Sequence, residues 1–177
     1  MKRREALRAF GAATALVLLP ADAFAAWARV ASGLRPTDGL SADRLALVGA
    51  IADTILPRTG SPGATDVGVP AFVDVIVSEQ YGDAERAAFI DGLAAIDALV
   101  RTAPAVSTAL ESIEAAADRR GEPARTYWRL KGLIVHGYFT SEPVMKDVLK
   151  VEIMPGAFDG AAPLRPAGRS TGGHSHG

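Results

Sequence analysis

The chain has 177 residues, of which 49% are hydrophobic and 22% charged, values typical of a globular rather than a disordered protein. Its formal net charge of −1 leaves no excess of basic residues for neutralising phosphates, which argues against a nucleic-acid-binding protein. The absence of cysteine excludes disulfides, thiolate metal sites, iron–sulfur clusters and covalently attached haem c in this chain.

The first 25 residues have the pattern of an export signal. Arg3 and Arg4 stand near its start, an apolar run follows over residues 9–19, and Ala23-Phe24-Ala25 has the small-x-small pattern that a signal peptidase accepts. The run is shorter than the roughly 20 apolar residues that span a bilayer. The arginine pair favours a twin-arginine signal, which exports folded proteins. An ordinary secretory signal and an uncleaved amphipathic anchor are the alternatives. Cleavage is expected after Ala25 or after Ala23.

The rest of the chain, about 150 residues, is enough for one domain with its own core. Residues 26–40 contain Gly33, Pro36 and Gly39, so we expect a linker there. Residues 41–160 are expected to form the folded domain, and residues 161–177 a flexible tail.

Apolar residues at helical spacing predict the helices of this domain. The first begins with Ser41 as its N-cap and ends before Pro57. A loop over 57–69 follows, long enough to need a functional or packing reason. Since no alternation typical of strands occurs, we predict a single all-α bundle of about five to six helices with a long internal loop and an extended C-terminal arm. The later helices are expected over Pro70 to Gly82, Asp83 to about Val100, about Ala105 to Arg120, Pro123 to Tyr138, and Ser141 to Val148.

The helix expected over residues 123–138 has an unusually wide apolar surface. Tyr127, Leu130, Ile134 and Tyr138 share one side of it, and an adjoining side carries further apolar residues. So wide an arc predicts contact with two neighbours, one of which is a candidate for another protein chain.

Few residues are candidates for chemistry. Asp53, within an apolar stretch, is expected to pair with Arg58, to cap a helix or to serve as a buried acid. His136 is expected to be exposed or hydrogen-bonded to a partner. His174 and His176 form a weak candidate metal site in the tail. None of these forms a complete catalytic constellation.

Three segments, in this order, resemble the gluconate 2-dehydrogenase subunit 3 family. The first runs from Ile51 through Asp53, Pro57 and Arg58 to Thr59 and continues to Phe72. The second is Gly137-Tyr138-Phe139-Thr140-Ser141-Glu142, and the third is Pro155-Gly156-Ala157-Phe158-Asp159-Gly160. Many relatives carry a cysteine shortly after the third segment, where this chain has Ala161-Ala162-Pro163, so a disulfide role does not apply here.

The resemblance implies a small subunit, without a cofactor of its own, of a periplasmic or membrane-associated flavoprotein dehydrogenase. In such complexes the large subunit binds FAD and oxidises a sugar or sugar acid, and a cytochrome c subunit, with haem c, often accepts the electrons. The small subunit is implied to be an export escort and stabiliser that supplies the twin-arginine signal for the translocon. Its implied partner surface includes Asp53, Pro57, Arg58, Tyr138, Phe139, Thr140, Ser141, Glu142, Pro155, Gly156, Phe158, Asp159 and Gly160.

Two other hypotheses remain open from the sequence. One is a stand-alone periplasmic enzyme that uses Asp53, His136 and Glu142 as acid–base or metal-binding groups. The other is a free-standing helical binding module. Tyr138 and Phe139 are likewise candidates either for a partner interface or for the core of the monomer.

Overall fold

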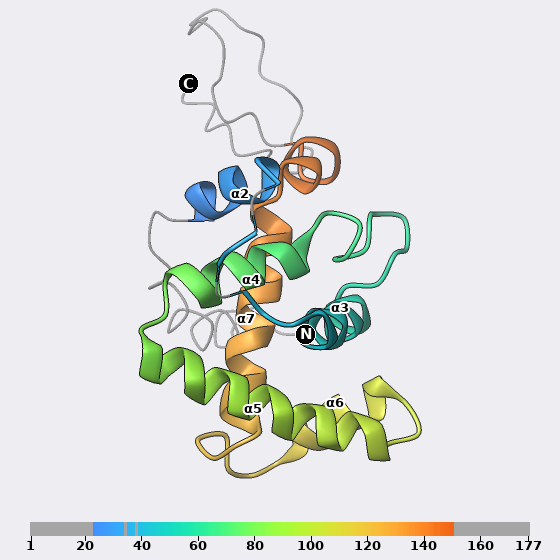
Figure 1. Ribbon diagram of the computed structural model, residues 1–177. Helices are drawn as coiled ribbons and strands as arrows, with labels where there is room; N and C mark the ends of the chain where they lie inside the picture. The colour runs from blue at the N-terminus through green and yellow to red at the C-terminus, as the bar shows by residue number, and fades with distance from the viewer. Residues whose placement is uncertain (1–22, 34, 38, 151–177) are drawn as a thin grey trace, which may run out of the picture.

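The computed structural model describes residues 23–33, 35–37 and 39–150. Every regular element in this part of the chain is a helix, which confirms the predicted all-α class (Figure 1). The long loop between the first two helices of the predicted domain is also present. The elements are α2 (Ala23–Ala31), α3 (Ala42–Ile55), α4 (Val69–Glu79), α5 (Asp83–Thr102), α6 (Val106–Ala115), α7 (Ala124–Thr140) and the short π-helix η2 (Val144–Val148).

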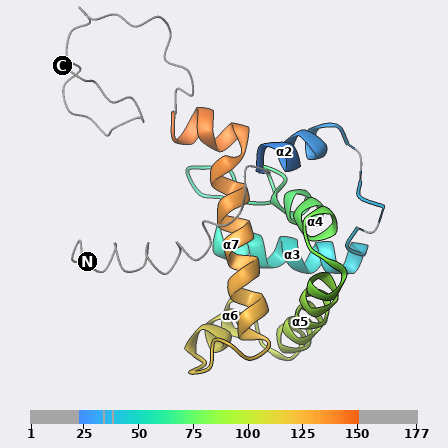
Figure 2. The ribbon, with the colours of Figure 1, turned by 90° about the vertical axis from the view of Figure 1, so that its left-hand side faces the viewer.

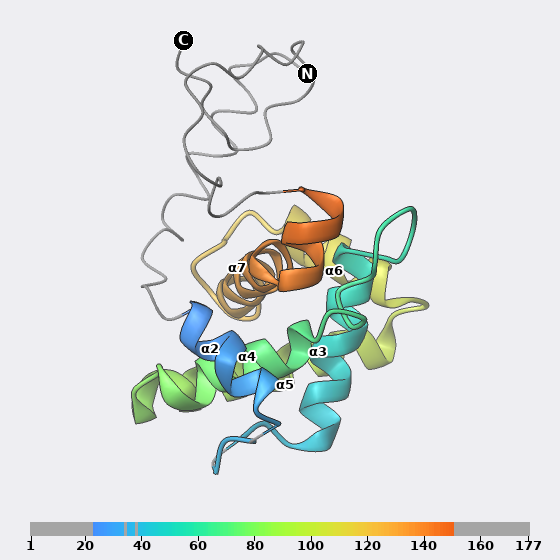
Figure 3. The same cartoon turned by 90° about the horizontal axis from the view of Figure 1, so that it is seen from above.

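Helix α7 is the central element of the fold. It packs against α2, α3, α4, α5, α6 and η2, and Figures 1 and 2 show it running through the middle of the bundle. The view along α7 in Figure 3 shows α2, α4 and α3 on one side of it. Its predicted apolar side is fully buried, because Tyr127, Leu130, Ile134 and Tyr138 all lie in the core. The wide apolar arc therefore reflects many neighbours within this chain.

Two glycines allow helices to approach α7 closely. A Cβ atom on Gly137 would lie 2.7 Å from the Phe72 ring of α4. A Cβ atom on Gly92 of α5 would lie 2.0 Å from Oγ1 of Thr126, at the other end of α7. Both distances are far below van der Waals contact, so each crossing depends on the missing side chain.

The predicted linker over residues 26–40 is wrong in its first part, because residues 23–31 form helix α2. Ala23 and Ala26 of this helix are buried, and the Trp27 ring stacks on Phe72 with 5.1 Å between the centroids. A nine-residue helix is marginal by itself. Helix α2 is stabilised by its tertiary contacts with α4 and α7. The apolar pattern of residues 23–31 alone therefore does not predict it.

The rest of that segment is held by Asp74, a buried residue of α4. One carboxylate oxygen of Asp74 accepts a hydrogen bond from the backbone N–H of Leu40 at 2.6 Å. The other accepts one from the Arg35 guanidinium at 3.3 Å. Helix α3 then begins at the predicted N-cap, Ser41, whose hydroxyl accepts the Arg44 N–H.

The other helices lie close to their predicted positions, with one clear difference. Helix α6 ends at Ala115 rather than near Arg120. The carboxylate of Asp118 accepts a hydrogen bond from the backbone N–H of Arg120 at 2.8 Å, so it stabilises a turn that competes with the helix. No helix in the described part of the chain has the length and hydropathy needed to cross a bilayer.

Candidate functional site

The loop over residues 56–68 is tied to the end of α3 by Asp53. The carboxylate of Asp53 accepts hydrogen bonds from the backbone N–H of Thr65 at 2.9 Å and from the Thr65 hydroxyl at 2.6 Å. Its expected pairing with Arg58 does not occur. Asp53 therefore neither pairs with Arg58 nor caps a helix: its carboxylate bonds the backbone N–H and the hydroxyl of Thr65 within the loop.

Arg58 pairs instead with Asp66 across the same loop. The second carboxylate oxygen of Asp66 accepts the backbone N–H of Gly63 at 2.7 Å. A Cβ atom on Gly63 would lie 3.1 Å from the Arg58 nitrogen and 3.2 Å from an Asp53 oxygen, so the loop is folded tightly at that point. The hydrogen bonds of the Asp53 and Asp66 carboxylates thus hold the loop in a defined conformation.

Tyr138 connects this loop to the central helix. Its hydroxyl donates a hydrogen bond to the carbonyl of Pro62 at 2.8 Å and lies 3.3 Å from the Ser61 hydroxyl. The Tyr138 side chain is otherwise buried. The two family-like segments that contain Asp53 and Tyr138 are therefore in direct contact, although they are far apart in the sequence.

The C-terminal end of α7 is fixed by Thr140 and Ser141. The Thr140 hydroxyl accepts a hydrogen bond from the indole N–H of Trp27 at 3.0 Å and donates to the His136 carbonyl at 2.8 Å. The hydroxyl of Ser141, which is fully buried, donates to the Tyr138 carbonyl at 2.7 Å. These two candidate residues hold the fold and offer little to a partner.

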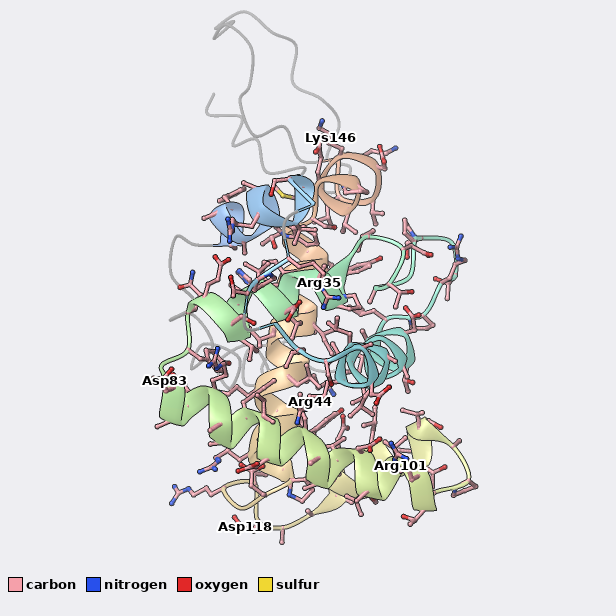
Figure 4. All side chains as sticks on the ribbon, in the orientation of Figure 1. Arg35, Arg44, Asp83, Arg101, Asp118 and Lys146 are labelled. Carbon is pink, nitrogen blue, oxygen red and sulfur yellow. The ribbon has the colours of Figure 1, made fainter. Side chains whose placement is uncertain are left out.

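Glu142 and Pro143 lie beside that end. Glu142 is exposed and pairs with Lys146, whose hydrogen bond and charge lower the pKa of the Glu142 carboxyl. Figure 4 shows Lys146 at the end of the molecule where α2 and η2 lie. Pro143 and the loop line an open hollow of about 400 Å³ that includes Arg58, Ser61 and Pro62.

Phe139 differs sharply from its neighbour Tyr138. The two rings meet edge to face at 5.3 Å, yet Phe139 is 44% exposed and Tyr138 only 5%. Tyr138 therefore belongs to the core of the monomer, whereas Phe139 is available to a partner.

Phe139 is one of several large apolar side chains exposed at one end of the molecule. Helix α2, the C-terminal end of α7 and η2 all lie at this end (Figures 1 and 2). We define the apical face as the exposed apolar residues of these elements and of the C-cap of η2, which are Phe24, Phe139, Val148 and Leu149.

His136 is less exposed than the sequence suggests. Its ring lies 6.1 Å from the Phe72 ring, and burial lowers the pKa of the imidazole below its usual value. Its Nε2 atom is buried and has no hydrogen-bond partner among the described residues. His136 is thus a half-buried residue that packs against Phe72.

The enzyme hypothesis requires Asp53, His136 and Glu142 to act together. Asp53 and Glu142 each have a structural partner, and His136 packs against an aromatic ring. Within residues 23–150, as far as the structure describes them, no three His, Asp or Glu side chains form a group that could hold a metal ion. The structure does not bring these three residues into one site.

Several predictions fall outside the described residues. These are the arginine pair Arg3 and Arg4, the segment Pro155, Gly156, Phe158, Asp159 and Gly160, and the histidines His174 and His176.

Sequence reasoning missed Trp27 and Asp74. Trp27 sits in an alanine-rich stretch that suits a helix, and a tryptophan there is a signal of burial. Asp74 interrupts the apolar run Phe72-Val73-Asp74-Val75-Ile76, and a carboxylate in such a run needs a partner.

Comparison with known proteins identifies the family of the chain. No curated protein and no solved structure gave a significant match. The family model for gluconate 2-dehydrogenase subunit 3 matches residues 42–156, which include α3 to η2, the loop over 56–68 and the end of α7. With nearly two thirds of its length matched by this model, the chain belongs to the gluconate 2-dehydrogenase subunit 3 family.

Proposed function

We propose that this chain is the accessory subunit that escorts an FAD-dependent gluconate or sugar dehydrogenase through export and then stabilises it in the periplasm. Its family is that of a subunit of a multi-subunit gluconate dehydrogenase. In this proposal the large subunit binds FAD and oxidises the sugar, and a cytochrome c subunit can accept the electrons. The chain itself contributes binding energy and an export signal.

The apical face is the observation that most directly supports a partner. Four of the five large apolar side chains exposed in the described residues belong to it. Large apolar side chains exposed on elements that meet at one end of the domain make that end a candidate interaction surface. Phe139 suits the centre of such an interface, because an aromatic ring buries a large area with few rotatable bonds.

Ion pairs lie on two of the elements that carry this face, η2 and α2. Glu142 pairs with Lys146, and Arg29 of α2 pairs with Glu79 of α4 at 2.5 Å. Exposed pairs of this kind contribute at most about 1 kcal/mol each to stability, and they can also orient a partner and exclude the wrong one. Exposed apolar side chains and ion pairs on the same elements have the mixed composition of a protein–protein interface.

Arg3 and Arg4 supply the export half of the proposal. A twin-arginine route carries folded proteins, so a large subunit can bind its FAD in the cytoplasm and cross the membrane bound to this chain. The large subunit then needs no signal of its own.

Co-expression with the flavoprotein tests this proposal. The flavoprotein is expected in the periplasm with the wild-type chain and in the cytoplasm with the Arg3→Lys/Arg4→Lys variant. Arg119→Lys/Arg120→Lys, a pair outside the signal, is the matched control and should leave export unchanged. If the flavoprotein reaches the periplasm equally well with Arg3→Lys/Arg4→Lys, this chain is not its escort.

A further inference from the structure

We propose that the fold of this protein protects its own predicted signal-peptidase site. The exported chain then keeps residues 1–25, the predicted export signal, which we call the leader. The bond after Ala25 lies inside helix α2, which is part of the packed domain. This inference rests on the twin-arginine route of the proposed function, because only that route delivers α2 already folded.

The residues around the bond are held in the folded domain. Ala23 and Ala26, on either side of the expected cut, are 8% and 2% exposed. Phe24 between them is exposed, and α2 continues through Ala31. A protease binds its substrate as an extended chain, so cleavage requires the first turn of α2 to unwind and both alanines to leave the core. Cleavage after Ala23 meets the same obstacle at the buried Ala23.

Three contacts hold α2 against this unwinding. The Trp27 ring stacks on Phe72 of α4, and its indole N–H donates to Thr140 of α7. Two residues further on, Arg29 forms an ion pair with Glu79 of α4. Trp27 is the second residue after the expected cut, so two of these three contacts lie next to the bond itself.

The segment between the apolar run and α2 is too short to move the bond far from the domain. Only the three residues 20–22 separate the end of the apolar run, Leu19, from Ala23. Three extended residues reach about 10 Å. A peptidase that holds the apolar run at the membrane therefore meets the bond next to the folded domain.

Whether the bond is cleaved depends on whether α2 folds before or after export. A chain that arrives unfolded exposes the bond before α2 forms, whereas a chain exported in its folded state presents α2 already packed. The exported protein therefore keeps residues 1–25, including the apolar run, which is too short to span a bilayer but remains attached to the complex.

Cleavage of purified full-length protein by signal peptidase tests this protection. The substrates are the folded full-length chain, the same chain unfolded in urea that the peptidase tolerates, and a peptide of residues 16–32. We expect the peptide and the unfolded chain to be cut after Ala25, and the folded chain to be cut at least about tenfold more slowly. Mass spectrometry of the product gives the site and the extent of cleavage.

A pair of variants links the protection to α2. Arg29→Ala/Thr140→Val removes two anchors of this helix without changing residues 23–27, and it should speed cleavage of the folded chain by about threefold or more. Arg101→Ala/Thr102→Val removes comparable polar contacts at the C-terminal end of α5, where Figure 4 shows Arg101, and should leave the cleavage rate unchanged.

Three outcomes would overturn the inference: a folded chain cut as fast as the peptide, a peptide that is itself not cut, or a periplasmic protein that begins at Ala26. Export of the flavoprotein is scored in the same cells. A flavoprotein that is exported with a processed chain contradicts leader retention alone. A flavoprotein that stays in the cytoplasm contradicts the escort role, while the resistance measured on purified protein stands separately.

Discussion

The indole N–H of Trp27 donates a hydrogen bond to the hydroxyl of Thr140, 3.0 Å away and 113 residues later in the chain. This contact joins α2 to the last residue of the central helix. It also connects a segment before the matched family region to the segment that contains Tyr138 and Phe139. The orientation of α2, and with it one side of the apical face, depends on this bond and on the stacking of Trp27 on Phe72.

Replacement of Trp27 separates the contribution of its hydrogen bond to Thr140 from that of its stacking on Phe72. Trp27→Phe keeps an aromatic ring and loses the hydrogen bond, so the free energy of unfolding should fall by about 1 kcal/mol. Trp27→Ala should cost about 3 kcal/mol, because it also removes the ring from Phe72. Urea denaturation measures both. In a double-mutant cycle, Trp27→Phe and Thr140→Val should be less than additive, and strict additivity would show that the bond contributes nothing.

Gly92 tests the close approach of α5 to α7. Gly92→Ala places a methyl group 2.0 Å from Oγ1 and 2.5 Å from Cβ of Thr126, so the helices must separate, and we expect a loss of about 1–3 kcal/mol of unfolding free energy. Gly60→Ala is the control, since no atom lies within 4 Å of the added methyl group. A thermal unfolding midpoint for Gly92→Ala equal to that of Gly60→Ala would contradict this packing.

The sequence predicted the helices that carry their own signals. Helix α3 has Ser41 as its cap, and α5 and α7 have long apolar spacings, so local physics suffices to place them. Helix α2 lacked such a signal, because its stability comes from Phe72, Thr140 and Glu79, which are distant in sequence.

The candidate site was also predictable only in part, because some of its features depend on contacts distant in sequence. The segments around Asp53 and Tyr138 could be picked out from the sequence, and they do meet in the structure. Which side chains hold the fold and which face solvent depends on helix rotation and neighbours. That information separates buried Ser141 and Tyr138 from exposed Phe139.

Loss of the Tyr138 hydroxyl should release the loop over 56–68 from α7. Tyr138→Phe keeps the buried ring and removes the hydrogen bond to the Pro62 carbonyl, at a cost of about 1 kcal/mol. Trypsin should then cut after Arg58 several times faster than in the wild-type protein, because the loop opens more often. Tyr127→Phe, which removes a hydroxyl bonded to Glu114, is the matched control and should leave cleavage at Arg58 unchanged. Equal rates for all three proteins would show that Tyr138 does not hold the loop.

His136 should make stability depend on pH in the weakly acidic range. Burial lowers the pKa of the folded imidazole, so the unfolded chain binds a proton more readily. The stabilising effect is fully present above the unfolded pKa of about 6.5 and is lost as the pH falls toward the folded pKa. In His136→Gln the fall in unfolding free energy between pH 7 and pH 5 should be smaller than in the wild type. His174→Gln/His176→Gln serves as the control for the other two histidines, and an unchanged slope in His136→Gln would contradict the prediction.

Phe139 should contribute more to partner binding than to the stability of this chain. Phe139→Ser removes a ring that is 44% exposed, so we expect a loss of unfolding free energy below about 1 kcal/mol. In the proposed interface the same change removes an aromatic anchor, and retention of the co-expressed flavoprotein should fall at least about tenfold, which corresponds to about 1.4 kcal/mol. Leu99→Ser is a matched control, because Leu99 is 37% exposed and lies on α5, outside the apical face. Flavoprotein recovered with the tagged chain measures the difference. Phe139 is the apical residue that belongs to the central helix itself. Equal recovery with both variants would therefore place the partner elsewhere on this subunit.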